Sequence, residues 1–479
     1  MTWILFGLAG LFALLLAILL LRTLTFRKKP LEAVEPAPVD FDHDKALSAL
    51  CELLRCRTVS RHAPEEEDEG EFLRLYELLP RLYPHVLAAC TLTRFEGRGL
   101  LFRWAGREAG DATVLMAHYD VVPADGEGWR HPPFDAVLED GHVYGRGTLD
   151  TKATFNAVLT AADTLIAQGF TPRHDVYLAF SGSEEISGRG MPEIVSHLAK
   201  EGVPIGLVLD EGGAVVEGAF PGVRCPTAMI GIAEKGFLDL EYRALSGGGH
   251  ASAPGRHTPI GRLAEAITEI ERKPARARIS PPVREMLRTL GPYASFPYRM
   301  VFANLWLFAP LLFLVGRLRG GELGALFRTT VAFTRMSGSE ANNVLPSEAT
   351  VVSNIRLAPG DTIDGTVHRL GRVIDDPRVK LRPLGGINPS RTSRTEGEGY
   401  LRTVRAVRAV WPRAVPTPYL MLQCSDSRHF SAISDCVYRF SAMALTKEER
   451  ATIHGKNERI SKEAALLAVE FYLRLLLDS

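Results

Sequence analysis

The amino-acid sequence predicts an α/β protein that has a mainly parallel sheet with helices on both faces, an inserted α+β domain and an N-terminal transmembrane helix. Three observations predict this architecture: an unbroken apolar run at the start of the chain, alternating strand and helix patterns up to about residue 228, and a different pattern after it. Because 479 residues are too many for one compact unit, we expect two folded domains with appendages.

The N-terminal run Trp3–Leu21 has roughly the 20 residues that a helix needs to cross a bilayer. It has no basic segment before it and no small-residue cleavage site, which predicts an uncleaved single-pass membrane anchor over residues 1–29 rather than a signal peptide. The basic flank lies on the C-terminal side of the run, so the positive-inside rule predicts that the following domain lies on the cytoplasmic face. Residues 30–41, rich in proline and glutamate, are expected to form a linker.

The folded body is expected to begin with a helix over Phe41–Val59, followed by an acidic stretch, Glu65–Glu71, that is expected to be a solvated loop. Three apolar strand candidates then occur, each followed directly by a polar cluster: Thr113–Ala117, Val176–Phe180 and Ile205–Leu209. Their alternation with helical patterns predicts a parallel sheet, and in such sheets the ligand site lies at the carboxyl ends of the strands.

After residue 228 the pattern predicts strand, helix, strand, strand, helix and strand, which is the ferredoxin-like order. The expected strands are Phe237–Ala244, Val331–Met336, Ala349–Leu357 and Val379–Pro383, and the expected helices are Thr258–Arg272 and Asp361–Ile374. An extra segment, Lys273–Phe327, interrupts this order. Its core, Val301–Val315, is apolar, too short to span a bilayer and broken at Asn304 and Pro310. So many apolar residues must contact protein, lipid or a greasy substrate.

Composition narrows the class of partner. Lys+Arg and Asp+Glu both total 56, so the formal net charge is zero and nothing indicates nucleic acid as a partner. The 6 cysteines form neither a CxxC motif nor a dense framework, which favours free thiols over disulfides.

The predicted strand ends carry acids and a histidine. His118-Tyr119-Asp120 follows the first strand, Ser181–Glu185 follows the second, and Asp210–Gly213 follows the third. A metal-binding histidine needs its second ring nitrogen held, and a carboxylate two residues on can hold it. Adjacent glutamates are commonly solvated, but directly after a buried strand they are better explained as a metal ligand and a general base.

Two further motifs lie away from these strands: Gly145–Lys152, which contains Asp150, and Ile453–Glu458, which contains His454. Each motif alone has a plain structural explanation, such as a turn or a core histidine, because short motifs recur by chance. Together the motifs supply oxygen and nitrogen ligands. That mixture suits zinc and, less specifically, cobalt or manganese.

In these motifs and their order, the chain from about residue 42 to its end resembles the co-catalytic di-zinc family of aminoacylase, carboxypeptidase S and succinyl-diaminopimelate desuccinylase. It is most similar to the branch of carboxypeptidase S and N-fatty-acyl-amino acid synthase/hydrolase, on the strength of its N-terminal apolar segment, Asn304-Leu305-Trp306 and Ser425-Asp426-Ser427-Arg428. The resemblance implies a phosphorylase/hydrolase-like catalytic domain split into residues 42–228 and 389–479. Residues 229–388 would form an inserted lid and dimerisation domain that includes the extra segment, 273–327.

The resemblance also implies how the metals are held. Asp150 would bridge two zinc ions in each subunit. His118 and Asp210 would complete one site, and Glu185 and His454 the other. The peptide bond after Asp150 is cis in the family, which is expected here too.

The remaining site residues are likewise assigned by the resemblance. Asp120 would orient the histidine before it, and Glu184 would be the general base that takes a proton from the attacking water. In the lid, His250 would stabilise the oxyanion of the tetrahedral intermediate, either in its own subunit or across a dimer. Asn343 and Arg356 would hold the substrate's carboxylate, a task that suits the planar guanidinium.

The predicted function is zinc-dependent hydrolysis of an amide bond to an amino acid with a free carboxylate, the substrate being an N-acyl amino acid or a short peptide. A dipeptidase or aminopeptidase with the same metals is one alternative. An alternative of another class is a catalytically inactive, membrane-tethered protein that binds a metal or ligand; it is disfavoured because Glu184 is present beside all five ligands. A homodimer through the lid and membrane contact by the extra segment are also expected.

Overall fold

The computed structural model describes residues 2–28, 38–218 and 220–479, so most of the predicted linker, residues 30–41, lies outside the described residues. Helix α1 spans Thr2–Thr25, slightly beyond the predicted apolar run. At ~1.5 Å per residue it is about 36 Å long, which exceeds the ~30 Å hydrocarbon core of a bilayer. Within the described part of the chain, it is the one helix that is long and apolar enough to cross a membrane by itself.

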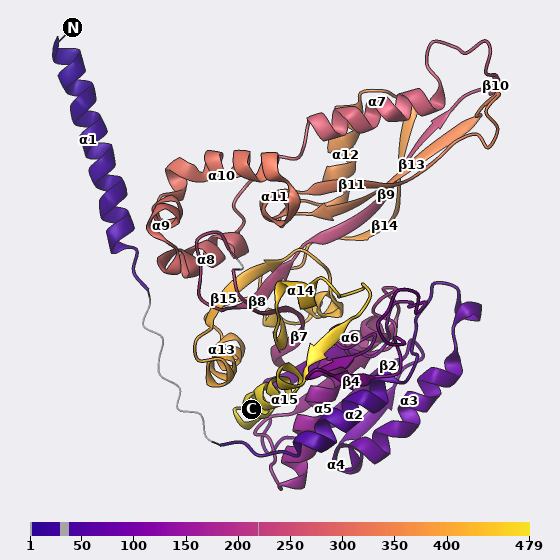
Figure 1. Ribbon diagram of the computed structural model, residues 1–479, viewed down its shortest axis with the longest axis vertical. Coiled ribbons are helices and arrows are strands. Elements are labelled where there is room, and N and C mark those ends of the chain that lie inside the picture. The colour runs from indigo at the N-terminus through magenta and orange to yellow at the C-terminus, as the bar shows by residue number, and fades with distance from the viewer. Residues whose placement is uncertain (1, 29–37, 219) are drawn as a thin grey trace.

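An eight-stranded sheet forms the frame of the larger unit (Figure 1). In sheet order its strands are β1 (Thr91–Arg94), β2 (Gly99–Trp104), β6 (Val176–Ser181), β3 (Ala112–His118), β7 (Ile205–Val216), β16 (Val437–Ala444), β8 (Thr227–Glu234) and β15 (Val415–Met421). The pairs β6–β3, β3–β7, β7–β16 and β8–β15 are parallel, whereas β1–β2, β2–β6 and β16–β8 are antiparallel. The sheet is therefore mainly parallel, as predicted.

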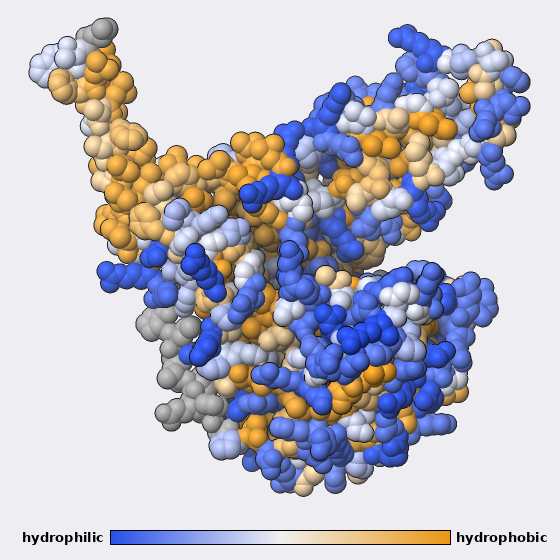
Figure 2. Space-filling model, viewed as in Figure 1, coloured by the Kyte–Doolittle hydropathy of each residue, from blue (hydrophilic) through white to orange (hydrophobic). Residues whose placement is uncertain are grey.

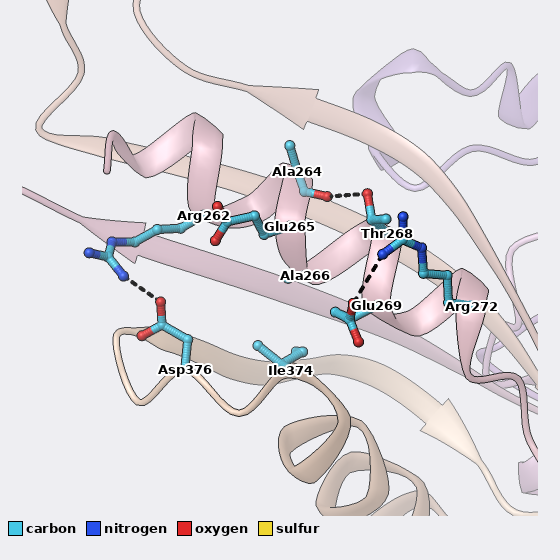
Figure 3. A pocket seen from close by; sticks show the side chains of 9 residues that line it. All are labelled: Arg262, Ala264, Glu265, Ala266, Thr268, Glu269, Arg272, Ile374 and Asp376. Atoms are coloured by element: carbon cyan, nitrogen blue, oxygen red, sulfur yellow. Dashed lines mark hydrogen bonds and ion pairs between the residues drawn. The ribbon is translucent and has the colours of Figure 1, made fainter. Parts of the chain in front are cut away.

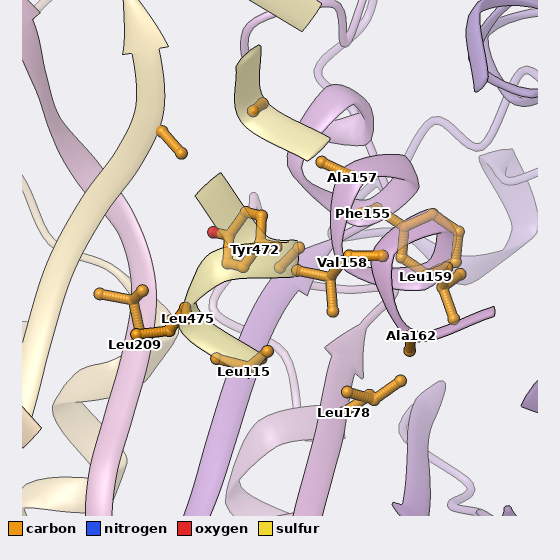
Figure 4. Packing of buried hydrophobic residues seen from close by; sticks show 14 of the residues in the cluster. Leu115, Phe155, Ala157, Val158, Leu159, Ala162, Leu178, Leu209, Tyr472 and Leu475 are labelled. Atoms are coloured by element: carbon orange, nitrogen blue, oxygen red, sulfur yellow. The ribbon is translucent and has the colours of Figure 1, made fainter. Parts of the chain in front are cut away.

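Helices cover both faces of this sheet. They are α2 (His43–Leu54), α3 (Glu69–Leu82), α4 (Pro84–Ala89), α5 (Lys152–Ala167), α6 (Gly190–Lys200), α13 (Glu398–Val410), α14 (Lys447–Arg450) and α15 (Lys462–Leu477). Side chains alternate along β3, as they must in an extended strand: Leu115 packs with Phe155 of α5 and Tyr472 of α15, whereas Val114 and Met116 pack on the face of α6. Figure 4 shows the first of these two layers.

Two predictions for the start of the body are wrong. Helix α2 ends at Leu54 instead of continuing to Val59. The acidic stretch Glu65–Glu71 is not a loop throughout, because the 3₁₀ turn η1 (Pro64–Glu66) and the first turn of α3 fall within it. The Asp68 carboxylate caps α3 by accepting a hydrogen bond from the Gly70 N–H, and acidic side chains are favourable in a first helical turn.

A second unit projects from the larger one (Figure 1). Its antiparallel sheet has the order β11 (Thr330–Ser337), β13 (Glu348–Leu357), β9 (Gly236–Leu245) and β14 (Val379–Ile387). Helices α7 (Pro259–Arg272) and α12 (Ile363–Ile374) pack on one face of it, where Leu263 and Leu370 join Leu240 and Val351 in a separate core. This strand order is that of the ferredoxin-like arrangement.

The extra segment between α7 and β11 is helical. It comprises α8 (Pro281–Leu290), η2 (Gly291–Tyr293), α9 (Phe296–Ala303), α10 (Leu305–Arg319) and α11 (Gly321–Phe327). The chain bends by 113° between α9 and α10, at Asn304, as the sequence predicts. The predicted break at Pro310 is wrong, because this residue lies inside α10 and the helix continues through it.

The apolar residues of α10 are largely exposed, with Trp306 58% and Leu318 77% accessible. Helix α9 contacts α1, and Figure 2 shows one hydrophobic surface that runs from α1 across this segment. The remaining short elements are β4 (Val137–Glu139), β5 (His142–Tyr144), β10 (Gly249–His250), β12 (Val344–Leu345), β17 (Arg459–Ser461) and η3 (Asp426–Ala432).

Candidate metal centre

The central strands bring the predicted motifs to one edge of the large sheet. β6, β3 and β7 are adjacent and parallel, so their carboxyl ends meet. His118 is the last residue of β3, and Glu184 and Glu185 follow β6. His118 is buried, Glu184 and Asp150 are partly exposed, and the His454 side chain is half exposed, so the cluster reaches from the protein interior to the solvent.

Asp150 lies between two histidines that are far apart in the sequence. Its Oδ1 is 2.8 Å from His118 Nε2, and its Oδ2 is 3.0 Å from His454 Nε2. His454 Nε2 is also 3.2 Å from Glu185 Oε1. A carboxylate with one oxygen directed at each of two ligand groups has the geometry of a bridge. The peptide bond from Asp150 to Thr151 is cis, as expected from the family resemblance.

Two overlapping groups of side chains present ligand atoms within 4.8 Å of one another. One group is His118, Asp150 and Glu185, and the other is His118, Glu184 and Glu211. Glu211 was not among the ligands predicted from the sequence.

The structure places Glu211, and not Asp210, against His118. Glu211 Oε1 is 3.5 Å from His118 Nε2, whereas the Asp210 carboxylate accepts a hydrogen bond from the Ser427 N–H at 2.8 Å. Strand β7 does not end at Leu209 as predicted but continues past both acids. Its register with β16 skips residues 211 and 212, so this bulge, together with the alternation of side chains, directs the two carboxylates to different surroundings.

Asp120, which follows β3, connects this strand end to the end of β6 through hydrogen bonds. Its carboxylate accepts hydrogen bonds from Ser60 Oγ at 2.6 Å and from the backbone N–H groups of Glu184 and Glu185, both at 3.1 Å. His118 Nδ1 lies 3.0 Å from the Asp120 carbonyl oxygen, which can only accept, so Nδ1 donates to it and Nε2 is the nitrogen directed at the carboxylates of Asp150 and Glu211. Asp120 thus orients His118 mainly through its main chain.

Glu458 holds the loop that carries Asp150 and was not assigned a role from the sequence. Its fully buried carboxylate pairs with Arg146 Nη1 at 2.5 Å and accepts hydrogen bonds from the backbone N–H groups of Gly147, at 3.1 Å, and Leu149, at 2.8 Å. Because Glu458 is four residues beyond His454, the same C-terminal segment supplies one candidate ligand and positions the loop of another. The sequence signal was present, since Glu458 closes the His454 motif, but its burial was not predictable.

The cluster concentrates negative charge in a buried space. Burial, reinforced by repulsion from Asp150, raises the pKa of Glu211 to about 8. Burial also raises the pKa of Glu184 well above its ordinary value. Hydrogen bonds to Asp150 and Glu185 raise the pKa of His454 to about 10. Carboxylates crowded in this way, with imidazole nitrogens among them, fit divalent cations of the zinc, cobalt or manganese type, which would neutralise the excess charge.

Arg356 lies near this edge but is not part of the cluster. Its Nη1 is 3.3 Å from Cys424 Sγ, and Cys424 immediately precedes the loop Ser425–Arg428. That loop contributes the Ser427 N–H to Asp210 and joins Ser425 to the buried Glu234. Arg356 therefore stands where the second unit meets the edge of the large sheet.

His250 and Asn343 lie together elsewhere. His250 belongs to β10, which pairs with β12, and the Ala251 N–H donates to the Asn343 carbonyl oxygen at 2.9 Å. β10 stands at the tip of the second unit, away from the large sheet (Figure 1), and both side chains are exposed. Within one chain, the structure does not bring Asn343 and Arg356 together as one carboxylate site.

Another hollow, of about 420 Å³, lies along α7 (Figure 3). Its charged side chains neutralise one another, since Arg262 pairs with Asp376 and Arg272 with Glu269. No histidine or cysteine is among the described residues that line it, so it has none of the chemistry of the cluster.

Comparisons with known proteins agree with this geometry. A model of peptidase family M20/M25/M40 matches residues 114–478. The N-fatty-acyl-amino acid synthase/hydrolase of Xenopus tropicalis is 35% identical over 477 residues, which cover 97% of this chain and 93% of that protein. A probable carboxypeptidase S-like protein of Dictyostelium discoideum is 32% identical over 479 residues, which cover 96% of this chain and 91% of that protein.

Solved structures show the same fold at low sequence identity. An M20 family metallo-carboxypeptidase from Sulfolobus solfataricus has a TM-score of 0.69 at 18% identity, covering 90% of this chain and 98% of that chain. A dinuclear metal-binding M20 peptidase from Bacillus subtilis has a TM-score of 0.55 at 11% identity, covering 91% of this chain and 98% of that chain.

Proposed function

The chain belongs to peptidase family M20/M25/M40 and is a metal-dependent hydrolase, and on this premise we propose that it hydrolyses the amide bond of N-acyl amino acids. The observation that carries the proposal is Asp150, whose two oxygens are directed at His118 and His454, with the partly exposed Glu184 within ligand distance of His118. Two relatives favour this substrate class, because one is named for N-fatty-acyl amino acids and the other is carboxypeptidase S-like.

We propose that two zinc ions, or cobalt or manganese in their place, are held by this cluster. Asp150 would bridge them, Glu185 and His454 would complete one site, and His118 would complete the other. Glu211 takes the place first given to Asp210, because only its carboxylate approaches His118. When bound, such ions polarise a substrate carbonyl and acidify water.

Glu184 would carry out the proton transfers of the reaction. A carboxylate with a raised pKa accepts a proton readily, so Glu184 takes the proton of the attacking water and passes it to the leaving amine. Arg356 would pair with the free carboxylate of the amino-acid half, which fixes which side of the amide bond is the leaving side.

The decisive test is product analysis of the purified, zinc-loaded protein on N-acyl amino acids and dipeptides of matched amino acids. Release of free amino acid from the N-acyl series, and its loss in Glu184→Gln, is expected. Preferential cleavage of dipeptides with a free N-terminus would instead make the protein a dipeptidase or aminopeptidase.

We further propose that residues 229–388 act as a lid and dimerisation domain on a catalytic domain of residues 42–228 and 389–479. From Glu348 to Arg356, β13 extends about 26 Å at ~3.3 Å per residue. His250 and Asn343 lie beyond its start, so they cannot contact a substrate that Arg356 of the same chain holds. A homodimer in which the tip of one subunit reaches the other's site resolves this separation.

Subunit mixing tests that arrangement. Glu184→Gln and His250→Ala homodimers should each be inactive, and exchange of their subunits should restore activity. In the mixed dimer, the chain with an intact Glu184 then receives His250 from its partner. Mixtures that stay inactive, although exchange is demonstrated by tagged subunits, would show that His250 acts within its own chain.

We also propose that α1 anchors the protein in a membrane as a single pass, with the enzyme on the cytoplasmic face. Resistance to alkaline extraction would establish the anchor. Protection of the folded body from protease in sealed cytoplasm-side-out vesicles would show that the enzyme lies on the opposite face of the membrane.

We propose in addition that the exposed apolar face of α10 brings a long acyl chain to the site. Replacing Leu305, Trp306 and Phe308 with polar residues should abolish a preference for long acyl chains and spare N-acetyl substrates.

A further inference from the structure

A second hollow, of about 600 Å³, lies at the base of α1, and none of its described lining residues belongs to the candidate metal centre. It is open to solvent and is lined by the end of α1, by α8 and by the junction of α9 with α10. Phe302, Leu305 and Trp306 give it an apolar wall, while Arg22 and Arg284 add guanidinium groups. Its size is that of a small-molecule site.

The charge of this hollow is entirely positive. Its ten described lining residues include Arg22, Arg284 and Arg288 and no acid. The acid of α8, Glu285, accepts a hydrogen bond from Thr395 at 3.1 Å and so is occupied elsewhere. Three guanidinium groups around one small space repel one another unless an anion lies between them.

Two of these arginines have no counter-charge in the described chain. Arg284 and Arg288 are exposed and one turn apart on α8, and among residues 2–28, 38–218 and 220–479 neither side chain forms an ion pair or hydrogen bond. Like charges at this spacing destabilise a helix slightly. Arg22 donates to the Ala303 carbonyl oxygen through Nε at 3.3 Å and Nη2 at 3.2 Å, which fixes its guanidinium at the rim.

The hollow lies beside the last turn of α1, at the depth where the hydrocarbon core would end if α1 spans a bilayer. Arg22 is in the last turn of α1, after the apolar run. The buried Asn304 side chain donates to the Leu19 carbonyl oxygen at 3.3 Å and to Thr23 Oγ1 at 3.4 Å, which fastens α1 to the α9–α10 bend. Beyond α1, Lys28 Nζ stands 4.7 Å from the centre of the Tyr293 ring.

Phosphate groups of lipids lie at this level, and the hollow adjoins the hydrophobic surface of α1 and α10 (Figure 2), because residues at the end of α1 and the start of α10 line it. We propose that the hollow binds one anionic phospholipid, with its phosphate between Arg284, Arg288 and Arg22 and its first acyl carbons against Phe302 and Trp306. Arginine forks match phosphate oxygens, and the aromatic wall accommodates the glycerol and acyl carbons. The proposal rests on the proposed anchoring by α1. A bound lipid would fasten the body to the bilayer with the face of α10 against it.

The test compares full-length, zinc-loaded protein in bilayer discs of phosphatidylcholine with and without phosphatidylglycerol. Native mass spectrometry of protein released from the discs counts retained lipid. The parent protein should retain one phosphatidylglycerol in preference to phosphatidylcholine. Arg284→Gln/Arg288→Gln should weaken this retention roughly tenfold to thirtyfold, since each basic side chain contributes about a factor of five near an anionic surface.

The matched control is Arg107→Gln/Arg372→Gln, which removes the same charge from two exposed arginines outside the hollow. It should retain phosphatidylglycerol as the parent does, and equal loss in both double variants would reduce the effect to general surface charge and overturn the proposal. Unchanged hydrolysis of an N-acetyl amino acid shows that each variant is folded. If the double variant does not fold, each single substitution should give part of the loss, and no loss in either overturns the site.

Further outcomes of this test distinguish a phospholipid from a fatty acid as the bound anion, and failure of the lipid site from failure of the membrane anchor. If a fatty acid displaces the retained lipid and the protein does not distinguish between phospholipids, the hollow binds the carboxylate of a free fatty acid. This result would overturn the proposal that it binds a phospholipid. If the protein resists alkaline extraction but does not retain phosphatidylglycerol in preference to phosphatidylcholine, the proposed lipid site is overturned and the proposed membrane anchor stands. Protein that is extracted by alkali refutes the anchor and with it the lipid site, whatever its hydrolytic activity.

Discussion

Glu458→Gln is the substitution whose effect the structure specifies most fully. The carboxylate is completely buried, pairs with Arg146 and accepts backbone hydrogen bonds from Gly147 and Leu149, in the loop that ends at Asp150. An amide of the same shape keeps one acceptor oxygen but turns an NH₂ group toward donors, and it leaves the Arg146 charge without its partner.

Breaking a buried ion pair from one side costs about 3–5 kcal/mol. For a chain of 479 residues, an unfolding entropy of ~2.1 cal/mol/K per residue makes this about 3–5 °C in Tm. Because the loop carries the candidate bridging ligand, zinc affinity should also fall by about 10–100-fold, as for other groups that orient metal ligands. Glu398→Gln is the control, since the Glu398–Arg405 pair is at the surface and worth less than about 1 kcal/mol.

Thermal unfolding of the full-length protein in detergent, with and without zinc, measures the first effect, and competition with a chromogenic chelator measures the second. Arg146→Met combined with Glu458→Gln should regain part of the stability, because no unpaired charge remains buried, but not the zinc affinity, because the loop N–H groups still lack their acceptor. A Tm within about 1 °C of the parent, together with unaltered zinc affinity, would refute the argument that Glu458 positions the Asp150 loop.

Four further predictions concern single side chains. Glu184→Gln should keep its zinc by elemental analysis yet lose about 10²–10⁴-fold in turnover; near-normal turnover would remove it as the base. Glu211→Ala should lose zinc whereas Asp210→Asn should retain it, and the reverse order would restore the original assignment. Arg356→Ala should impair an N-acyl amino acid more than the corresponding N-acyl amino-acid amide, while equal loss would make Arg356 structural. Burial lowers the pKa of Lys235 from 10.5 to about 7, so between these values the unfolded chain binds more protons and stability rises with pH. Lys235→Met should remove up to about 1.4 kcal/mol per pH unit of that rise in denaturant titrations, and an unchanged slope would contradict the shift.

The parallel sheet and most of its site were predictable because local pattern and topology determine them together. A buried apolar run followed by His118, or by Glu184 and Glu185, indicates a strand whose end is polar, and parallel neighbours bring such ends to one edge. Glu211 was missed because its orientation depends on a bulge in β7. Which of two adjacent acids faces a site is decided by the register with a strand more than two hundred residues away.

The other wrong predictions concern features that sequence composition alone does not determine. The acidic run before α3 has the composition of a loop, but Asp68 caps a helix within it, and capping outweighs composition there. Pro310 was expected to break α10, yet the helix continues through this exposed residue. The separation of Asn343 from Arg356 follows from the length and direction of β13 in the folded unit, which no motif encodes.

The placement of His454 and Glu458 near the end of the chain has a consequence for synthesis. Helix α1 precedes the enzyme in the chain, so under the proposed anchoring it could engage a membrane while most of the enzyme is still untranslated. The Asp150 loop receives its buried acceptor, and the cluster its second histidine, only when the last segment before α15 has been made. If α1 anchors the protein as proposed, a growing chain would be attached to its membrane before it could hydrolyse a substrate.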